Sequence, residues 1–408
     1  MKFPLITIFL MLTSRSHCWF FGSLSTDICD KLCKCPTDLH EVREKGLDCR
    51  DRNIQDLPDE LAIPDTIAKV DFSRNHIGQL LDITFNTNNK ILYLDFSDND
   101  IEHLYDNVFQ TVPNLKNLLL RNNKLKSISE KAFVGVTNLT SLDLSYNQLE
   151  NLPSSAFESL TALEELILDF NPLVRPDLLL LANNSQLRSL SLSEVGIETL
   201  HPDFFPENLK KLEKLSLAHN DISFVPTKAL FRIRESLKEL DLSGNPIQTL
   251  GAYSFYGLSN VRSLRLDQML KLETIEEFAF GDLRHLETCI LRYMPRIVTI
   301  HPKAFRTANN KTEMIIPVED FTFSFSILST LPEKLLNWST LQYADMKYNH
   351  WNCDCQMQWV KNSSLLEKVG SHMLCSKPIH LRGHSIINIP EKDFVCLAEE
   401  PETLTRHQ

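Results

Sequence analysis

The chain has 408 residues, of which 43% are apolar and 23% are charged, and its formal net charge is -11. No block of lysines and arginines interrupts the mixture of charges along the sequence. A surface that neutralises nucleic-acid phosphates needs clustered positive charge, so nucleic acid is not expected as a partner.

The first residues predict export of the chain. Lys2 precedes a short apolar run from Pro4 to Leu12, which is too short to span a bilayer and is typical of a signal peptide. We expect the signal peptide to cover residues 1–22, although small residues offer more than one cleavage site. No later stretch approaches the ~20 apolar residues of a spanning helix, so no membrane span is expected in this chain.

The ten cysteines form two clusters of four, and two cysteines are left over. Even sets in an exported protein favour disulfides over zinc, and neither cluster has the paired CxxC of common zinc sites. No metal is therefore expected. Four cysteines allow three pairings, among which the sequence alone does not choose. The clusters are Cys29, Cys33, Cys35 and Cys49, then Cys353, Cys355, Cys375 and Cys396, and the remaining two are Cys18 and Cys289.

One apolar motif recurs eleven times along the chain, mostly in steps of 24 or 25 residues. Further apolar residues follow three and five places after each start, as in Leu139, Leu142 and Leu144. This alternation predicts a short, half-buried strand in every copy. The starts are Ile67, Ile91, Leu115, Leu139, Leu163, Leu187, Leu212, Leu237, Val261, Leu286 and Leu341.

Two further residue types recur in register with these starts. An asparagine stands eight places on in most copies, where an inward amide can bond the backbone groups that a turning strand leaves free. A phenylalanine follows at eighteen or nineteen places and is expected to form a core spine. The asparagines are Asn75, Asn99, Asn123, Asn147, Asn171, Asn220, Asn245 and Asn349, and the phenylalanines are Phe85, Phe109, Phe133, Phe157, Phe205, Phe255, Phe280 and Phe305.

The pattern resembles the leucine-rich repeat family of extracellular type, which has LxxLxLxxN at 24 residues. The resemblance implies an α/β repeat solenoid, a curved horseshoe in which each coil adds one strand to a parallel sheet on the concave face. About 12 repeats are expected over residues 67–350. The register is not assigned between Arg306 and Thr340, where one irregular repeat is expected. Cys289 takes an inward leucine position and is expected to be a free, packed thiol.

Both cysteine clusters stand where a stack of repeats needs caps over its open ends. They resemble the N-terminal and C-terminal cysteine-rich caps of secreted leucine-rich repeat proteins, with expected bounds of 27–66 and 351–397 and a tail at 398–408. The expected fold therefore has disulfide-bonded caps at both ends. The family pattern implies that the first cysteine pairs with the third and the second with the fourth: Cys29 with Cys35, Cys33 with Cys49, Cys353 with Cys375, and Cys355 with Cys396.

Five sequons predict a glycoprotein, since each is an acceptor in an exported chain. A bulky sugar would bar partners from the surface around it, and the alternative is that some sequons are unused. The acceptors are Asn138, Asn183, Asn310, Asn337 and Asn362.

No catalytic motif is present in the sequence: G-x-S-x-G, H-E-x-x-H and a Gly-rich phosphate loop are all missing. Asp71, Asp95 and Asp143 share one outward column, which raises the idea of acid–base pairs or a calcium site. Solvated charges on a strand face are the better account, because the sequence supplies no further ligands. We expect no enzyme, no catalytic residue and no cofactor.

Recognition is the function that remains. Residues that change from copy to copy, such as Thr140, Ser141 and Tyr146, are expected on the concave surface. Our hypothesis is a secreted glycoprotein that binds an extracellular or cell-surface protein through this surface. The alternative is the ectodomain of a single-pass receptor or cell-adhesion protein whose transmembrane part is missing from this chain, and fold analogy does not choose between them. Pairing of two solenoids into a homodimer is left open.

Apolar and aromatic residues interrupt the polar concave pattern in two places away from the end coils. Exposed aromatics and arginines that lie close together are common in binding hot spots. The alternative is that these are scattered surface apolar residues without a role. The first place is Leu119, Tyr146, Ile167 and Phe170, and the second is Arg265, Ile290, Arg292 and Tyr293.

Overall fold

The structure is a computed structural model that describes residues 32–34, 46–58, 61, 63, 67–81, 90–174, 176–309 and 312–396. The expected signal peptide, the tail at 398–408, Phe85 and the predicted pair Cys29–Cys35 lie outside these residues.

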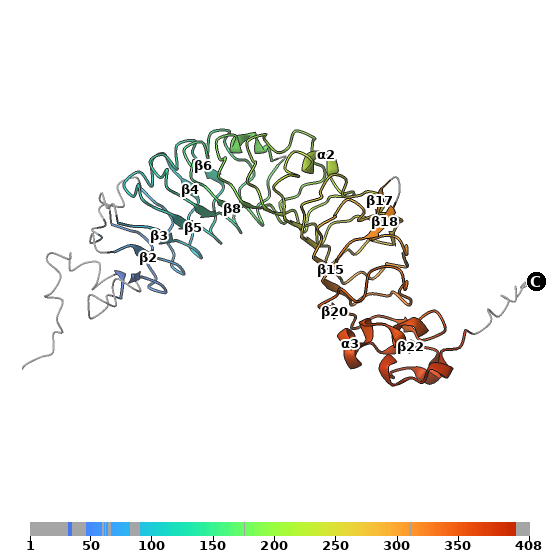
Figure 1. Cartoon of the computed structure of the whole chain (residues 1–408). Coiled ribbons are helices and arrows are strands. Elements are labelled where there is room, and N and C mark those ends of the chain that lie inside the picture. The colour runs from blue at the N-terminus through green and yellow to red at the C-terminus, as the bar shows by residue number, and fades with distance from the viewer. Residues whose placement is uncertain are drawn as a thin grey trace, which may run out of the picture.

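The chain forms an open arch whose inner side is lined by one 13-stranded sheet (Figure 1). Each strand pairs in parallel with the strand of the next coil, as β5 does with β7. The predicted curved solenoid with a parallel concave sheet is therefore confirmed. In order, the strands are β1 (Leu47–Asp48), β2 (Lys69–Asp71), β3 (Tyr93–Asp95), β5 (Asn117–Leu119), β7 (Ser141–Asp143), β8 (Glu165–Ile167), β9 (Ser189–Ser191), β10 (Lys214–Ser216), β11 (Glu239–Asp241), β13 (Ser263–Arg265), β15 (Thr288–Arg292), β19 (Asp320–Ser324) and β20 (Tyr343–Asp345).

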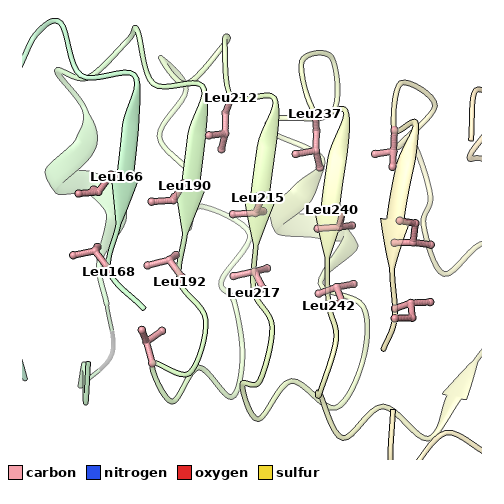
Figure 2. Close-up of a cluster of buried hydrophobic side chains, with 14 of the residues drawn as sticks. Leu166, Leu168, Leu190, Leu192, Leu212, Leu215, Leu217, Leu237, Leu240 and Leu242 are labelled. Atoms are coloured by element: carbon pink, nitrogen blue, oxygen red, sulfur yellow. The ribbon is translucent and has the colours of Figure 1, made fainter. Parts of the chain in front are cut away.

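The repeated leucines fill the interior of the arch in rows. Leu142 pairs in register with Leu118 on one side and Leu166 on the other, and all three are fully buried. Figure 2 shows two such rows, one through Leu166 and Leu190 and one through the residues two places further on. Each leucine buried in this way contributes about 1.5–3 kcal/mol, so neighbouring coils stabilise one another through every rung.

The recurring asparagines form a hydrogen-bonded ladder where the strands end. Asn171 donates from Nδ2 to the carbonyl oxygens of Leu168 at 2.9 Å and of Leu144, in the preceding coil, at 3.0 Å. Its Oδ1 accepts from the backbone N–H of Leu149 at 3.1 Å. The same amide thus satisfies groups of two coils, which is the role predicted for this position from the sequence.

Shorter elements lie on the returning part of the coils, around the phenylalanine spine. Phe109 and Phe133 are fully buried with ring centroids 6.0 Å apart, and Phe280 and Phe305 stack at 4.2 Å. Figure 1 places β4, β6 and α2 on the outer side of the arch. These shorter elements are β4 (His103–Leu104), β6 (Ser127–Ile128), η2 (Leu178–Leu181), α2 (Thr227–Leu230), β12 (Thr249–Leu250), β14 (Thr274–Ile275) and β16 (Thr299–Ile300).

The region whose register the sequence did not assign contains an insertion and a complete repeat. A hairpin of β17 (Arg306–Asn309) and β18 (Thr312–Ile315) lengthens one coil, and β19 then pairs in parallel with both β15 and β20. The new repeat begins at Val318, because Phe321 and Phe323 are its next buried positions. Ser326 takes the place of the asparagine and accepts from the N–H of Met294 at 3.2 Å.

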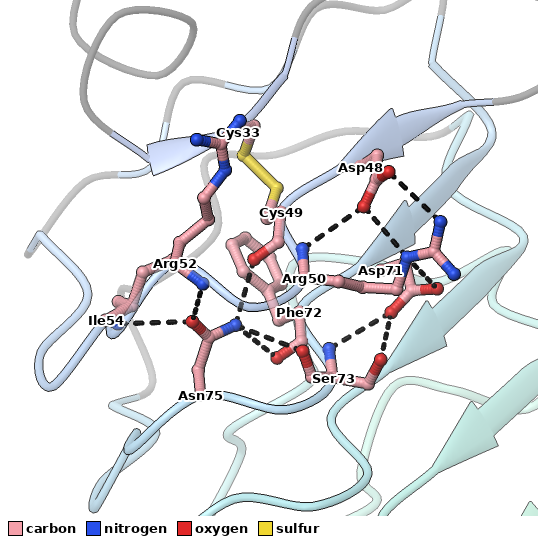
Figure 3. The surroundings of a disulfide bond; sticks show 10 residues. All are labelled: Cys33, Asp48, Cys49, Arg50, Arg52, Ile54, Asp71, Phe72, Ser73 and Asn75. Atoms are coloured by element: carbon pink, nitrogen blue, oxygen red, sulfur yellow. Dashed lines mark hydrogen bonds and ion pairs between the residues drawn. A yellow bond between two sulfur atoms is a disulfide. The ribbon is translucent and has the colours of Figure 1, made fainter.

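A disulfide and an ion pair close the N-terminal end of the sheet. Cys33 is joined to Cys49, and β1 adds one more strand beside β2. Figure 3 shows that the Arg50 guanidinium holds the carboxylate of Asp48, with Nε 2.9 Å from Oδ1. This hydrogen bond lowers the pKa of Asp48 to about 2.

The C-terminal end is covered by a small unit of short helices and two strands. Disulfides join Cys353 to Cys375 and Cys355 to Cys396, as the family pattern implied. Trp351 is fully buried and donates from Nε1 to the Met346 carbonyl at 3.1 Å, which ties this unit to the last coil. The elements are β21 (Trp351–Asn352), η3 (Gln358–Asn362), α3 (Leu365–Val369), η4 (Gly370–His372), β22 (Cys375–Lys377), η5 (Ile379–Leu381), η6 (Ile386–Asn388) and η7 (Glu391–Asp393).

Candidate interaction surface

A row of residues with left-handed backbone runs along one edge of the concave face. Each stands directly before the position of the ladder asparagine, where the chain turns away from its strand, and φ is 55° at both Tyr146 and Phe170. Because the strands are parallel, all these turns meet at the same edge. We call the row the edge column: Arg74, Asp98, Asn122, Tyr146, Phe170, Glu194, His219, Gly244, Gln268, Tyr293, Phe325 and Tyr348.

Two neighbours in the edge column form an exposed aromatic pair. The rings of Tyr146 and Phe170 stack with centroids 4.1 Å apart and planes 16° from parallel, and 37% and 38% of the two residues are exposed. The guanidinium of Arg121 lies over the other side of the Tyr146 ring, with Cζ 4.2 Å from its centroid. Stacking and the cation–π contact restrain all three side chains, so they present a preformed surface.

Leu119 and Ile167, the other two residues of the first predicted place, lie half-buried on the strands beside this pair. They do not pair with each other, because Asp143 stands between them in the sheet and is in register with both. The structure therefore brings the four predicted residues onto three successive coils, Leu119 and Ile167 on strands and Tyr146 and Phe170 in the turns that follow β7 and β8. We call Leu119, Arg121, Tyr146, Ile167 and Phe170 the Tyr146 cluster.

The second predicted place is organised around Asp267, a buried carboxylate that the sequence did not single out. Arg292 donates to it from Nε at 3.0 Å and from Nη2 at 2.7 Å, and Arg265 donates from Nη2 at 3.1 Å. Ile290 is in register with Arg265 on the neighbouring strand, and Tyr293 follows β15 in the edge column. Asp267 thus fixes both arginines in place, and Arg265 also pairs with Asp241, with its Nε 3.4 Å from Oδ2.

Tyr293 begins a second aromatic run that the sequence reasoning missed. Its ring stacks on Phe325 at 4.5 Å, and Phe325 stacks on Tyr348, also at 4.5 Å. The exposed fractions are 44%, 38% and 70% from Tyr293 to Tyr348. Phe325 belongs to the repeat whose register the sequence does not assign, and Tyr348 belongs to an end coil, outside the region in which the sequence predicts the two places. The distance from the repeat start Leu341 identifies the position of Tyr348 from the sequence, whereas that of Phe325 follows only from the start at Val318, which the structure assigns.

Small polar side chains separate the two predicted places. The concave face across β9, β10, β11 and β13 is hollowed by about 210 Å³, and its lining includes Ser189, Ser191, Ser216 and Ser263. Lys214 and Glu239 form an ion pair at 2.8 Å across this floor. The middle of the arch is therefore polar and recessed, with apolar surface on both sides of it.

Asp169 stands at the border of this polar region. Its Oδ1 accepts from the backbone N–H of Ser193 at 2.7 Å. Burial raises the pKa of the Asp169 carboxyl, while hydrogen bonds from Ser191 and Ser193 oppose that shift in part. These contacts bridge adjacent coils, which is a structural role.

The aspartates of the outward column are bonded to the backbone as well as half-exposed. Asp71, Asp95 and Asp143 each accept from the N–H two residues further on, at 3.0, 2.9 and 2.9 Å. They support the turn that follows each strand, a role beyond the solvated charges expected from the sequence. Among the described residues, no group of three or more His, Cys, Asp or Glu side chains is placed to hold a metal ion.

Four of the five sequons lie within the described residues, and all four asparagines are exposed. Asn138 precedes β7, so it lies at the opposite ends of the strands from the edge column, and its Nδ2 donates to the Pro113 carbonyl at 3.1 Å. Asn183 follows η2 in the returning part of its coil, Asn337 precedes a repeat start, and Asn362 ends η3. Asn310 lies outside the described residues. Glycosylation of these sites stays a prediction.

A third exposed aromatic group lies on the outer side of the arch, beside α2. Phe231 and Tyr256 stack at 6.3 Å, and Cζ of Arg234 is 3.7 Å above the Phe231 ring. The two rings are 40% and 60% exposed. Aromatic surface is thus not confined to the concave face, and this pair offers a matched comparison for the Tyr146 cluster.

Helices in the described part of the chain are all short, and none is long and apolar enough to cross a membrane. Cys289 is fully buried, and its thiol is not bonded to another cysteine. Burial raises the pKa of this thiol far above its usual range.

Comparison with known proteins agrees with this architecture. The sequence profile described as "Leucine rich repeat" matches residues 65–125, 113–173, 210–270 and 235–293. Leucine-rich repeat and fibronectin type III domain-containing protein 1 of Danio rerio is 23% identical over 173 residues, 42% of this chain and 25% of that protein. Toll-like receptor 3 of Bos taurus is 31% identical over 125 residues, 28% of this chain and 14% of that protein. The chain thus spans a quarter or less of these relatives.

Solved structures share the fold over most of the chain. A chain from the octameric complex of Latrophilin 3, Unc5D and FLRT2 has a TM-score of 0.57 and 20% identity, and the match covers 84% of this chain and 94% of that one. A chain from the glycosylated Toll–Spatzle complex of Drosophila also has a TM-score of 0.57 and 20% identity, and covers 85% of this chain and 48% of that one.

Proposed function

Because the chain belongs to the leucine-rich repeat family, we propose that it is a secreted glycoprotein that binds a partner protein in the extracellular space through its concave face. The disulfides at both ends support this proposal, since such bonds persist in oxidising compartments. The four exposed sequon asparagines support it as well. Two similar proteins are described in complexes with other proteins, namely FLRT2 with Latrophilin 3 and Unc5D, and Toll with Spatzle.

The observation that carries the proposal is the Tyr146 cluster. Tyr146 and Phe170 are more than one-third exposed, although burying such rings would contribute more to stability. They are restrained by stacking and by Arg121, so little side-chain entropy remains to be lost on binding. Rigid aromatic and arginine side chains are the residues most enriched in binding hot spots.

The test replaces both rings and measures binding of the secreted chain. We expect the Tyr146→Ser/Phe170→Ser variant to lose ~2 kcal/mol or more of binding free energy, about 30-fold in Kd, towards partners found in a screen of cell-surface and matrix proteins. The matched control is Phe231→Ser/Tyr256→Ser on the outer side. Secretion and thermal stability should stay nearly unchanged in both variants. Unaltered affinity in the first variant would move the contact away from this cluster.

The runner-up is the ectodomain of a single-pass receptor or cell-adhesion protein, and it is favoured by the name of one relative, Toll-like receptor 3. This alternative predicts the same binding surface, but on a chain that is anchored in the membrane by a transmembrane helix. Sequencing the transcript beyond the codon for Gln408 discriminates the two: a stop codon supports the secreted form, and a run of ~20 apolar residues supports the receptor.

A further inference from the structure

The aromatic run at the C-terminal end of the edge column leads into a hollow that the proposed contact at the Tyr146 cluster does not use. The hollow has a volume of about 350 Å³ and lies between the last coil and the C-terminal cap. Lys347 and Tyr348 line it from the coil, and His372, Leu374 and Arg382 line it from the cap. We call this cavity, lined by these five residues, the cap hollow.

The charge of the cap hollow differs from that of the rest of the chain. None of the described residues that line it is acidic, whereas the whole chain has a formal net charge of -11. Within the described part of the chain, no carboxylate pairs with Lys347 or Arg382, in contrast to Arg265 and Arg292, which both pair with Asp267. Two cations, half-exposed Lys347 and exposed Arg382, therefore line the hollow without a paired carboxylate among the described residues.

Apolar surface lies directly beside these cations. Tyr348 is 70% exposed and is held from one side by Phe325, while Leu374 is 48% exposed. An exposed ring that is fixed by stacking can pack against a leucine or an aromatic side chain of a ligand without losing much freedom. None of the described sequon asparagines lines the hollow. A glycan on one of them would therefore be attached outside the hollow.

We propose that the cap hollow binds an acidic segment of a partner protein that also carries a leucine or aromatic side chain. Carboxylates of the segment pair with Lys347 and Arg382, and its apolar side chain packs on Tyr348 and Leu374. A sulfated polysaccharide fits less well, because it needs a longer run of cations and has no apolar side chain to pack on Tyr348 and Leu374. This inference rests on the proposed protein-binding function and adds a second contact with its own chemistry.

The test selects displayed random peptides on the full secreted chain and measures their affinity by titration. We expect the selected peptides to combine Asp or Glu with Leu or an aromatic residue. Their Kd should rise at least about tenfold in Lys347→Glu/Arg382→Glu and in Tyr348→Ser. The matched control, Lys368→Glu/Lys392→Glu, makes the same charge change on exposed positions of the same cap and should leave Kd unchanged. Lys347→Gln/Arg382→Gln serves if charge reversal impairs secretion.

Several results would overturn the inference. Neutral or basic peptides, or an equal loss in the control variant, would show that the hollow has no preference for acidic segments. Heparin binding that depends on Lys347 and Arg382, without peptide selection, would assign it to a polyanion. Self-association lost in the charge variant would assign it to a second copy of the chain. If any of these occurs while Tyr146→Ser/Phe170→Ser still weakens partner binding, the proposed function stands and only the cap hollow inference fails.

Discussion

Arg292 donates two hydrogen bonds to the carboxylate of Asp267, from Nε to Oδ1 at 3.0 Å and from Nη2 to Oδ2 at 2.7 Å. Arg265 approaches the same carboxylate from the neighbouring strand at 3.1 Å. Three charged side chains from β13, β15 and the turn between coils therefore act as one unit. Any partner that meets this part of the concave face meets guanidinium groups whose positions are already set.

Replacing Asp267 tests this arrangement. We expect Asp267→Ala to destabilise the chain by about 1–3 kcal/mol, because the charge-assisted hydrogen bonds from both arginines are lost. Arg265 keeps its ion pair with Asp241, whereas Arg292 loses the carboxylate that holds it. The control is Asp221→Ala, whose side chain is exposed and whose loss should change stability by less than about 0.5 kcal/mol. Thermal unfolding followed by circular dichroism gives the comparison. Equal effects of the two substitutions would mean that the ion pairs contribute nothing measurable.

The hydrogen bonds of the asparagine ladder predict that replacing one of its asparagines lowers the free energy of unfolding substantially. Asn171→Ala leaves the N–H of Leu149 and the carbonyl of Leu168 without their side-chain partner inside the arch. The carbonyl of Leu144 loses one of its two side-chain donors and keeps the bond from Asn147. Each buried polar group left unsatisfied costs about 1–3 kcal/mol, so the variant should lose at least about 2 kcal/mol. Asn151→Ala, at an exposed asparagine, should be nearly neutral. A ladder variant as stable as this control would refute the hydrogen-bonding role.

The buried carboxyl of Asp169 predicts that the difference in stability between an Asp169 variant and the parent chain grows with pH. Burial raises its pKa in the folded chain, so the folded state binds a proton more tightly than the unfolded state, and ionisation destabilises the fold as pH rises from the ordinary value of about 3.9 through the raised pKa. An asparagine at this position would keep an oxygen acceptor for Ser193 and carry no charge. We therefore expect Asp169→Asn to be more stable than the parent at neutral pH, with the difference shrinking as pH falls. Melting curves over a pH series check this, and a difference independent of pH would contradict it.

The thiol of Cys289 should react only when the chain unfolds. The residue is fully buried between Leu264 and Phe321 in the sheet, and its raised pKa leaves almost no thiolate at neutral pH. Iodoacetamide should leave the peptide that contains Cys289 unmodified in the native chain and modify it in denaturant. Mass spectrometry of the two digests provides the readout. Rapid labelling of the native chain would place this thiol at the surface, against the inward position of its repeat.

The inward half of this protein could be read from the sequence because each coil contacts only its neighbours. Leu142 and Asn147 recur at fixed distances from their repeat start, and each meets the same residue type one coil away. The period therefore predicted the strand, the leucine rows and the ladder without knowledge of long-range contacts. The cysteine pairs at the C-terminal end followed from the family pattern, since four cysteines by themselves allow three pairings.

The same periodicity failed where one coil departs from it. The β17–β18 hairpin places Val318 32 residues after Leu286, in contrast to the usual 24 or 25. Phe325 therefore had no register, and its stacking between Tyr293 and Tyr348 could not be foreseen. A hairpin that projects from the stack adds residues without adding a rung, and only the paired strands of the folded chain reveal how many residues to skip.

The sequence by itself determined which residues face inward, because burial in a stack of repeats selects the same residue types at the same spacing in every coil. The tertiary structure alone decided what the outward residues do. Arg292 and Asp267, and Tyr146 and Phe170, are about one coil apart in sequence, and their contact depends on how neighbouring side chains share an edge. Outward positions have no repeated packing requirement, so their residue types do not recur with the repeat. Their charge pairing, stacking and exposure are set only when the coils lie side by side.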